Sequence, residues 1–169
     1  MAESTSLLMR QARKGLEGSN PSPSAMLYKE FLHTLDECPF CSDKNRILMD
    51  GTHAYLTYAL APYHKHHLLV LPKRHVESVK DLNEAEREEI DRLQKEGLRI
   101  LRCLNYESIS LLVREGPVNV NKSIRHTHYH VIPKIQIGDL DHYGQERRIL
   151  EKNEIEEMAD EIETIIKGT

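Results

Sequence analysis

An α+β domain is the fold class that the sequence predicts, with a mainly antiparallel sheet of about five strands, one long helix and a C-terminal helix. Short β-prone runs follow one another closely, and two of them are joined by Asp50-Gly51, a strong hairpin signal. Two longer segments, at 83–104 and 145–167, place apolar residues at intervals of three and four, as amphipathic helices do. Hairpin-linked strands with inserted helices favour helices that pack on one face of an antiparallel sheet.

The composition is that of a single globular domain. The chain has 169 residues, of which 39% are hydrophobic and 30% are charged, and it contains no apolar run long enough for a membrane span. The N-terminus lacks the basic start and apolar region of a secretory signal, so we expect a cytoplasmic protein without a membrane partner. A net charge of −4 gives no general attraction to long nucleic acid, whereas a small phosphate ester remains a suitable ligand.

The chain divides into an expected flexible N-terminal arm, residues 1–24, and one domain, residues 25–169. Glycines and a run rich in serine and proline at 19–24 interrupt any helix that begins in the arm. Apolar residues at 25–35 approximate helical spacing and lead to the motif Cys38-Pro-Phe-Cys41. This first helix therefore delivers the chain to a pair of cysteines.

Five runs have the composition of strands. They are residues 46–49, 54–59, 66–71, 108–113 and 126–133. The helix at 83–104 begins at Asn83, and Glu86 three residues later completes a capping-box start. On this helix we expect Cys103 in the core and the Glu and Arg residues on a solvated face.

The most informative stretch is HTHYHVIP, from His126 to Pro133. Alternation with period two places His126, His128 and His130 on one face of a strand, with the intervening residues facing the packed side. Three imidazoles around one ligand can bind a divalent metal, or they can divide labour around a phosphate, with one acting as nucleophile. A solvated strand that is merely rich in histidine is the alternative without a function.

The motif His-x-His-x-His followed by two apolar residues resembles that of the histidine triad family, whose members mostly transfer or hydrolyse nucleotidyl groups through the middle histidine. The resemblance runs from Cys38 to Asp139 and includes the paired cysteines and Pro72-Lys-Arg-His75. It implies the α+β fold of that family and a homodimer. The residues after the triad are more similar to the fragile-histidine-triad and dinucleoside polyphosphate phosphorylase branches than to the phosphoramidase branch.

The resemblance also implies roles in catalysis. His128 matches the nucleophile that forms a covalent nucleotidyl-histidine, and His130 would donate to the phosphate and stabilise charge in the transition state. A backbone carbonyl is our candidate for the group that holds the other nitrogen of His128. Ser123 matches a phosphate contact, while Lys122 and Arg114 replace the usual Gln and Asn and add positive charge there. A lysine at the phosphate favours anionic leaving groups, and a lysine that extends into solvent is the alternative.

Cys38 and Cys41 have a spacing that can grip one tetrahedral zinc ion, although such a pair can equally be redox-active or simply buried. In zinc-containing relatives, the histidine of Pro-Lys-x-His and the first histidine of the triad complete the ligand set. The resemblance therefore implies one structural Zn2+ held by Cys38, Cys41, His75 and His126. A closed set of four ligands leaves no position for water or substrate.

A second histidine-rich segment lies ahead of Pro72. The resemblance places His67 on a histidine of the family and His66 where glycine is usual. We therefore expect His64 and His66 to be exposed loop residues rather than a second metal site.

These patterns predict a nucleotidyl hydrolase or transferase that acts on the α-phosphate of a nucleotide or dinucleoside polyphosphate. One alternative is a nucleotide-binding protein of the same fold with little turnover. Another is a zinc-dependent hydrolase that uses the triad itself as an open metal site. No short motif marks the base or distinguishes hydrolysis from phosphorolysis.

Overall fold

The computed structural model describes residues 27–118, 122–135 and 148–168. Its helices are α2 (Tyr28–His33), α3 (Pro39–Ser42), the 3-10 helix η2 (Val79–Asp81), α4 (Glu84–Cys103) and α6 (Lys152–Lys167). Its strands are β1 (Ile47–Asp50), β2 (Ala54–Tyr58), β3 (Leu68–Pro72), β4 (Ile109–Val113) and β5 (Tyr129–Pro133). The expected arm at 1–24 and the first residues of the predicted C-terminal helix, 145–147, lie outside the described residues.

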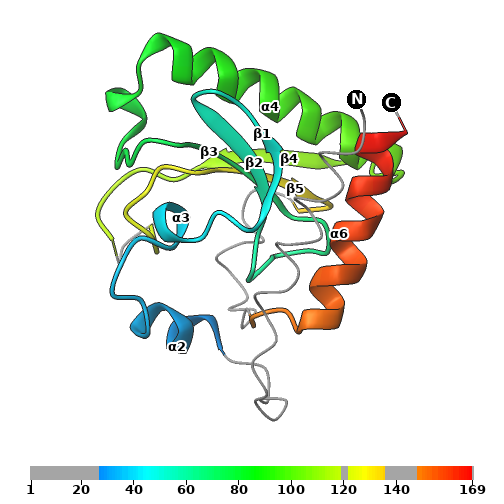
Figure 1. The fold of residues 1–169 in the computed structure, drawn as a ribbon, viewed down its shortest axis with the longest axis horizontal. Helices are drawn as coiled ribbons and strands as arrows, with labels where there is room; N and C mark the ends of the chain where they lie inside the picture. Colours follow the sequence, from blue (N-terminus) through cyan, green and yellow to red (C-terminus); the bar gives the residue numbers. More distant parts are fainter. Residues whose placement is uncertain (1–26, 119–121, 136–147, 169) are drawn as a thin grey trace, which may run out of the picture.

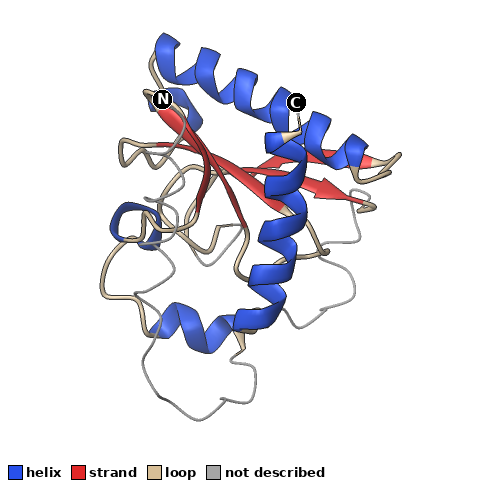
Figure 2. Cartoon of the chain, turned by 45° about the vertical axis from the view of Figure 1, so that its right-hand side comes forward, coloured by secondary structure: helices blue, strands red, loops and turns tan. Residues whose placement is uncertain are grey.

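The five strands form one sheet in the order β1-β2-β3-β5-β4, and every neighbouring pair is antiparallel. The predicted α+β class and antiparallel sheet are thus confirmed. Helix α4 runs along one face of the sheet, α6 packs at one end, and α2 lies on the other side from α4 (Figures 1 and 2). Helix α3, which carries the cysteine motif, lies near the sheet on that other side (Figure 1).

Helix α4 begins as the sequence predicts. The side chain of Asn83 accepts the N–H of Glu86 at 2.9 Å, and the Glu86 carboxylate accepts the N–H of Asn83 at 2.9 Å. The expectation that all of its acidic residues face solvent is wrong, because Glu86 is only 3% exposed and binds the guanidinium of Arg74 through both oxygens. A buried carboxylate is tolerated here because a cation and the cap satisfy it.

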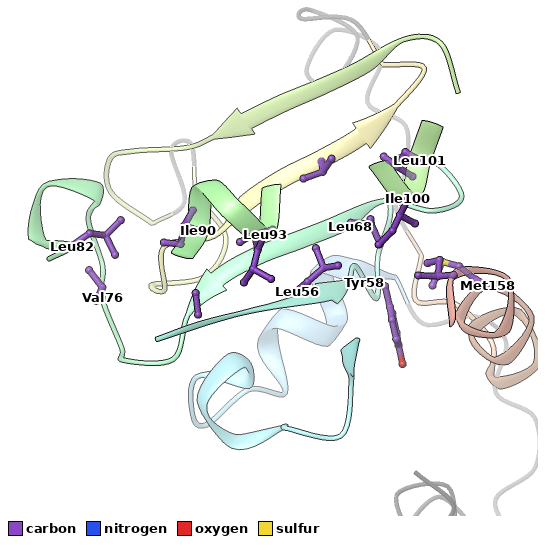
Figure 3. Close-up of a cluster of buried hydrophobic side chains, with 14 residues drawn as sticks. Leu56, Tyr58, Leu68, Val76, Leu82, Ile90, Leu93, Ile100, Leu101 and Met158 are labelled. Carbon is purple, nitrogen blue, oxygen red and sulfur yellow. The ribbon is translucent and has the colours of Figure 1, made fainter. Parts of the chain in front are cut away.

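The main core lies between α4, the sheet and α6 (Figure 3). Leu56 and Leu68 of the sheet meet Leu93 and Ile100 of α4, and each of the four is fully buried. Burial of one such side chain contributes about 1.5–3 kcal/mol. Helix α6 adds Met158 to the same cluster, as Figure 3 shows.

The prediction that Cys103 lies in this core is wrong, because the residue is exposed. Leu101 is fully buried, and two residues further along a helix corresponds to a rotation of about 200°. Cys103 therefore lies on the side of α4 away from the sheet.

A carboxylate of α4 also anchors the β1–β2 hairpin. Glu89 accepts the N–H groups of Thr52, His53 and Ala54 at 3.2, 2.5 and 2.9 Å. A Cβ on Gly51 would lie 2.5 Å from the Glu89 carboxylate, so a larger residue there would displace the carboxylate from these N–H groups. Burial of the carboxylate opposes its ionisation, but the three N–H groups outweigh that effect and hold the pKa of Glu89 at about 2.

The two faces of the sheet have different surroundings. Val131 of β5 belongs to the core under α4, as the predicted alternation requires, whereas its neighbour His130 points to the opposite face. On that face a smaller cluster joins Phe40 of α3 to Tyr55 and Leu69 of the sheet. The histidines therefore lie on the side of the sheet that carries α3.

The strand that was predicted from His126 begins only at Tyr129. The residues just before it are held differently, since the N–H of Thr127 donates to the carbonyl oxygen of Val76 at 2.6 Å. This contact brings the first triad histidine beside the segment that follows β3.

A candidate metal cluster and histidine site

The predicted metal ligands come together. One ligand atom from each of Cys38, Cys41, His75 and His126 lies within 4.8 Å of the other three. The Nδ1 atom of His126 is 3.4 Å from the Cys38 sulfur and 3.5 Å from the Cys41 sulfur, and His75 Nδ1 is 3.3 Å from the Cys41 sulfur. Sulfur and nitrogen ligands at 2.3 and 2.0 Å from one tetrahedral ion would lie about 3.5 Å apart, so the spacing suits a zinc ion.

The protonation of His126 also suits a ligand. Its Nε2–H donates to the carbonyl oxygen of Pro72 at 3.0 Å, which leaves Nδ1 unprotonated and directed at the two sulfur atoms. Burial lowers the pKa of His126 to about 4, so the imidazole is neutral at pH 7. Partial burial and then the neighbouring Cys38 raise the pKa of Cys41, and a cation beside its sulfur would favour the thiolate.

The middle histidine is oriented by the main chain. The Nδ1 atom of His128 lies 2.6 Å from the carbonyl oxygen of His126. A carbonyl only accepts, so Nδ1 carries the proton and Nε2 carries the lone pair. His128 is 8% exposed, and its ring lies 5.2 Å from that of Phe40. The backbone carbonyl that we expected to hold this tautomer is therefore present.

A chain of hydrogen bonds orients the third histidine. The N–H of Tyr63 donates to Nδ1 of His67 at 3.3 Å, and Nε2 of His67 lies 2.9 Å from Nδ1 of His130. With both rings neutral, His67 donates through Nε2 and His130 accepts at Nδ1, so the proton of His130 is on Nε2. His130 is only 6% exposed, and its ring lies 4.8 Å from that of His128.

Two residues predicted at the phosphate, Ser123 and Arg114, are near the triad in the chain or in the sheet. Ser123 precedes the triad and its Oγ is 2.7 Å from the hydroxyl of Tyr28. Arg114 directly follows β4, where Leu112 pairs with His130. The last pair of this ladder joins Val113, directly before Arg114, to Tyr129, directly after His128.

Lys122 is buried at 6% exposure, so the alternative that it extends into solvent is wrong. Its ammonium group donates to the carbonyl oxygen of Glu77. The lysine lines a pocket of about 350 Å³ together with Glu77, Gly116, Pro117, Val118 and Arg125. The lining has two cations, Lys122 and Arg125, and one carboxylate, Glu77, so its net charge is positive and favours an anion.

The expectation that His66 is exposed is wrong, since the residue is 4% exposed, and His64 is half-buried. Nε2 of His66 lies 2.5 Å from a carboxylate oxygen of Glu161 on α6, and Nδ1 lies 2.8 Å from the hydroxyl of Tyr106. His66 has a φ of 67°, the left-handed conformation that favours glycine, and the triad family usually has glycine there. Two polar partners make this burial and this conformation tolerable for a histidine.

Two residues without a predicted role contact residues of the predicted site. His67 bonds to His130, and Tyr28 bonds to Ser123. The family pattern ahead of Pro72 marks His67 in the sequence. Tyr28 reaches Ser123 from a distant helix, and no local spacing marks it.

A five-stranded antiparallel α+β fold with alternating histidines on its open face defines the class of histidine triad proteins. The sequence model of the family described as "Scavenger mRNA decapping enzyme C-term binding" matches residues 37–142, more than half of the chain. The chain therefore belongs to this family of histidine triad proteins.

Known relatives agree with this family. An uncharacterised HIT-like protein of Methanocaldococcus jannaschii is 23% identical over 131 residues, which cover 74% of this chain and 98% of that protein. The structure of Plasmodium falciparum diadenosine triphosphate hydrolase has a TM-score of 0.63 at 19% identity, with 95% of this chain and 97% of that chain covered. A zinc-bound histidine triad protein of Mycobacterium smegmatis has a TM-score of 0.60 at 20% identity, with coverage of 78% and 94%.

A membrane-spanning segment is not found among the helices that the structure describes. None of these helices is both long and apolar enough to cross a bilayer.

Proposed function

We propose that the protein is a nucleotidyl hydrolase or transferase that cleaves a phosphoanhydride or phosphoramidate bond through a covalent nucleotidyl-His128. The observation that carries this proposal is the hydrogen bond from His128 Nδ1 to the carbonyl oxygen of His126, which leaves Nε2 as a nucleophilic lone pair. Family membership supports a nucleotide-directed hydrolase, and one relative of the same fold is named a diadenosine triphosphate hydrolase.

In the first step, Nε2 of His128 attacks the α-phosphorus and the bond from phosphorus to the leaving group breaks. The leaving group departs with the bonding electron pair, and a nucleotidyl-histidine remains. In the second step, water or inorganic phosphate attacks the same phosphorus, the N–P bond breaks, and the electron pair returns to Nε2. An attacking water releases its proton to the solvent. Each step places negative charge on the phosphoryl oxygens, which donors nearby must stabilise.

His130 is the principal donor in this proposal. The hydrogen bond from His67 places the His130 proton on Nε2, so a neutral ring can donate to a phosphoryl oxygen. Ser123 supplies a hydroxyl, and Arg114 and Lys122 supply positive charge. Substrates with anionic leaving groups, such as dinucleoside polyphosphates, are therefore the preferred class.

We propose further that Cys38, Cys41, His75 and His126 hold one structural zinc ion. The donor set, the spacing of the ligand atoms and the fixed tautomer of His126 support this assignment, and a relative of the same fold is zinc-bound. The ion would stabilise the fold by joining the α3 segment to the residues after β3 and before β5. A zinc hydrolase that uses the whole triad as an open site is not favoured, since His126 is directed at the cysteines and His128 at a carbonyl.

A homodimer is also part of the proposal. Strand β4 is at the end of the sheet order, and its Leu111 is 47% exposed, the largest exposure of a bulky apolar residue among those described. An edge strand with an exposed leucine offers an apolar surface for a second copy. Light scattering at micromolar concentration tests this, and a monomer would remove the dimer from the proposal.

The nucleotidyl-histidine can be sought directly. The protein is incubated with diadenosine triphosphate, quenched at alkaline pH and measured by intact-mass spectrometry. The expected result is an adenylyl adduct in the parent and none in His128→Ala. An adduct that persists in His128→Ala would assign the nucleophile to another residue.

A further inference from the structure

Helix α2 places a hydroxyl group against Ser123. Tyr28, in the first turn of α2, places its phenolic oxygen 2.7 Å from Oγ of Ser123, although 95 residues separate the two. Both side chains are half-buried. Ser123 is the serine that the proposed function assigns to the substrate phosphate, so Tyr28 touches the site through it.

Several contacts hold Tyr28 in this position. Its ring is stacked on that of Phe31, with the centroids 6.4 Å apart and the planes at 24°. Leu27, directly before α2, forms an isolated antiparallel bridge with Arg148. A short segment then connects α2 to Cys38 of the metal cluster. The helix is thus tied at both of its ends, and the phenol is directed at Ser123.

Two hydroxyl groups in contact share one proton between them, and the other proton is available to a ligand. A phenol, with a pKa of about 10, is more acidic than an aliphatic alcohol and is the better donor. When Tyr28 donates to Ser123, the hydroxyl proton of Ser123 is directed away from Tyr28. The hydrogen bond that Ser123 then donates to a ligand is strengthened by the hydrogen bond that it accepts from Tyr28.

We propose that Tyr28 is a positioning residue of the phosphate site: its O–H donates to Ser123 Oγ, so that Ser123 donates its own proton to a phosphoryl oxygen of the substrate. This inference rests on the proposed function, because it needs Ser123 at the phosphate. It adds α2, an element outside the histidine-bearing sheet, to the machinery that recognises substrate. In the opposite arrangement Ser123 donates to Tyr28, and the phenol itself touches the phosphate.

A double-mutant cycle separates these arrangements. The parent, Tyr28→Phe, Ser123→Ala and the double variant are compared by kcat/KM for diadenosine triphosphate and by the Kd for adenosine monophosphate, which needs no turnover. Phenylalanine keeps the stack on Phe31 and removes only the hydroxyl. Thr34→Val is the matched control, because Thr34 caps the C-terminal end of α2 and its hydroxyl bonds only to the carbonyl oxygen of Phe31 among the described contacts.

We expect Ser123→Ala to lower kcat/KM about 100-fold, as the loss of one donor to a transition-state oxyanion does. Tyr28→Phe should lower it about tenfold in the parent and by less than about twofold in the Ser123→Ala background, because the two groups act as one unit. Both variants should also weaken the binding of adenosine monophosphate, Ser123→Ala more than Tyr28→Phe. Thr34→Val should keep the kcat/KM and the Kd of the parent. All variants should keep a melting temperature near that of the parent.

Failure of this inference and failure of the proposed function give different results. If Ser123→Ala leaves both readouts unchanged, the phosphate contact of the proposed function is wrong, and the inference is wrong with it. If Ser123→Ala is impaired while Tyr28→Phe equals the parent, only the positioning role of Tyr28 is overturned. If Tyr28→Phe lowers kcat/KM by the same factor in the parent and in Ser123→Ala, Tyr28 contacts the phosphate directly. The proposed direction of the hydrogen bond is then wrong.

Discussion

Nε2 of His67 lies 2.9 Å from Nδ1 of His130. His67 directly precedes β3, and His130 lies on β5, which pairs with β3. His67→Ala removes the group that sets the tautomer of His130. We expect kcat to fall about tenfold, the value of one hydrogen bond of about 1.4 kcal/mol. The melting temperature should fall as well, because His67 is fully buried and alanine leaves a cavity. Steady-state kinetics checks this, with His33→Ala, exposed on α2, as the control. A parent-like kcat would show that His130 needs no support from His67.

His128→Ala should lower kcat by more than about 10⁴-fold, because removal of a nucleophile abolishes the covalent route. Nucleotide binding should remain within about threefold, since the phosphate donors are still present. Single-turnover kinetics and calorimetry with adenosine monophosphate measure the two effects. His130→Ala should slow the reaction less completely. Turnover near that of the parent in His128→Ala would exclude the covalent mechanism.

Cys38→Ser should remove the zinc ion and lower the melting temperature, because metal binding contributes folding free energy. Metal analysis after purification without chelators should find one ion per chain in the parent and much less in the variant. Cys103→Ser is the matched control, since this cysteine is exposed and lies outside the cluster. Parent protein without metal, or equal melting temperatures for the two variants, would argue against a structural zinc site.

Glu89→Gln should lower the free energy of unfolding by about 1–3 kcal/mol at pH 7, because three N–H groups lose a charged acceptor. The pKa of Glu89 is depressed from its ordinary value of 4.5 to about 2. The stabilisation is therefore fully present above pH 4.5 and is lost as the pH falls toward 2. Thermal melts across this range should show the parent and the variant converging, while the exposed neighbour Glu88→Gln follows the parent throughout. A difference that is independent of pH would contradict the ionised anchor.

Lys122→Gln tests the preference for anionic leaving groups. One N–H of the ammonium group is taken by the Glu77 carbonyl, and the remaining donors and the charge still face a pocket shared with Arg125. We expect the ratio of kcat/KM for diadenosine triphosphate over an adenosine phosphoramidate to fall about fivefold or more, which corresponds to about 1 kcal/mol of attraction. Arg125→Gln is the control for loss of charge at the pocket rim. An unchanged ratio, or a shift toward the polyphosphate, would overturn this role.

The parts of the fold that the sequence predicted are those set by residues close together in the chain. Asn83 and Glu86 form the capping box because they are three residues apart, and Val131 faces the core because strands alternate. The start of β5 was misplaced because period two describes an extended chain and does not say whether a partner strand is present. At Thr127 the partner is the carbonyl of Val76 and not a strand.

The candidate site was predictable where a motif names its residues, as for Cys38 and His128. It was not predictable where a polar side chain takes its partner from a distant element. Tyr28 and Ser123 meet only because the fold brings α2 to the triad. His66 was expected in an exposed loop because it matches a position where glycine is usual in the family. Its burial depends on Glu161 and Tyr106, which come from other elements.

The contact of His66 with Glu161 has a consequence for how the molecule matures on the ribosome. The histidines of the triad precede α6 in the chain, so they leave the exit tunnel earlier. A nascent chain that has exposed β5 but not α6 holds all the proposed catalytic histidines, yet it lacks the carboxylate that binds His66 next to His67. During synthesis, the proposed catalytic histidines therefore appear before Glu161 can bind His66 and fix the segment that carries His67.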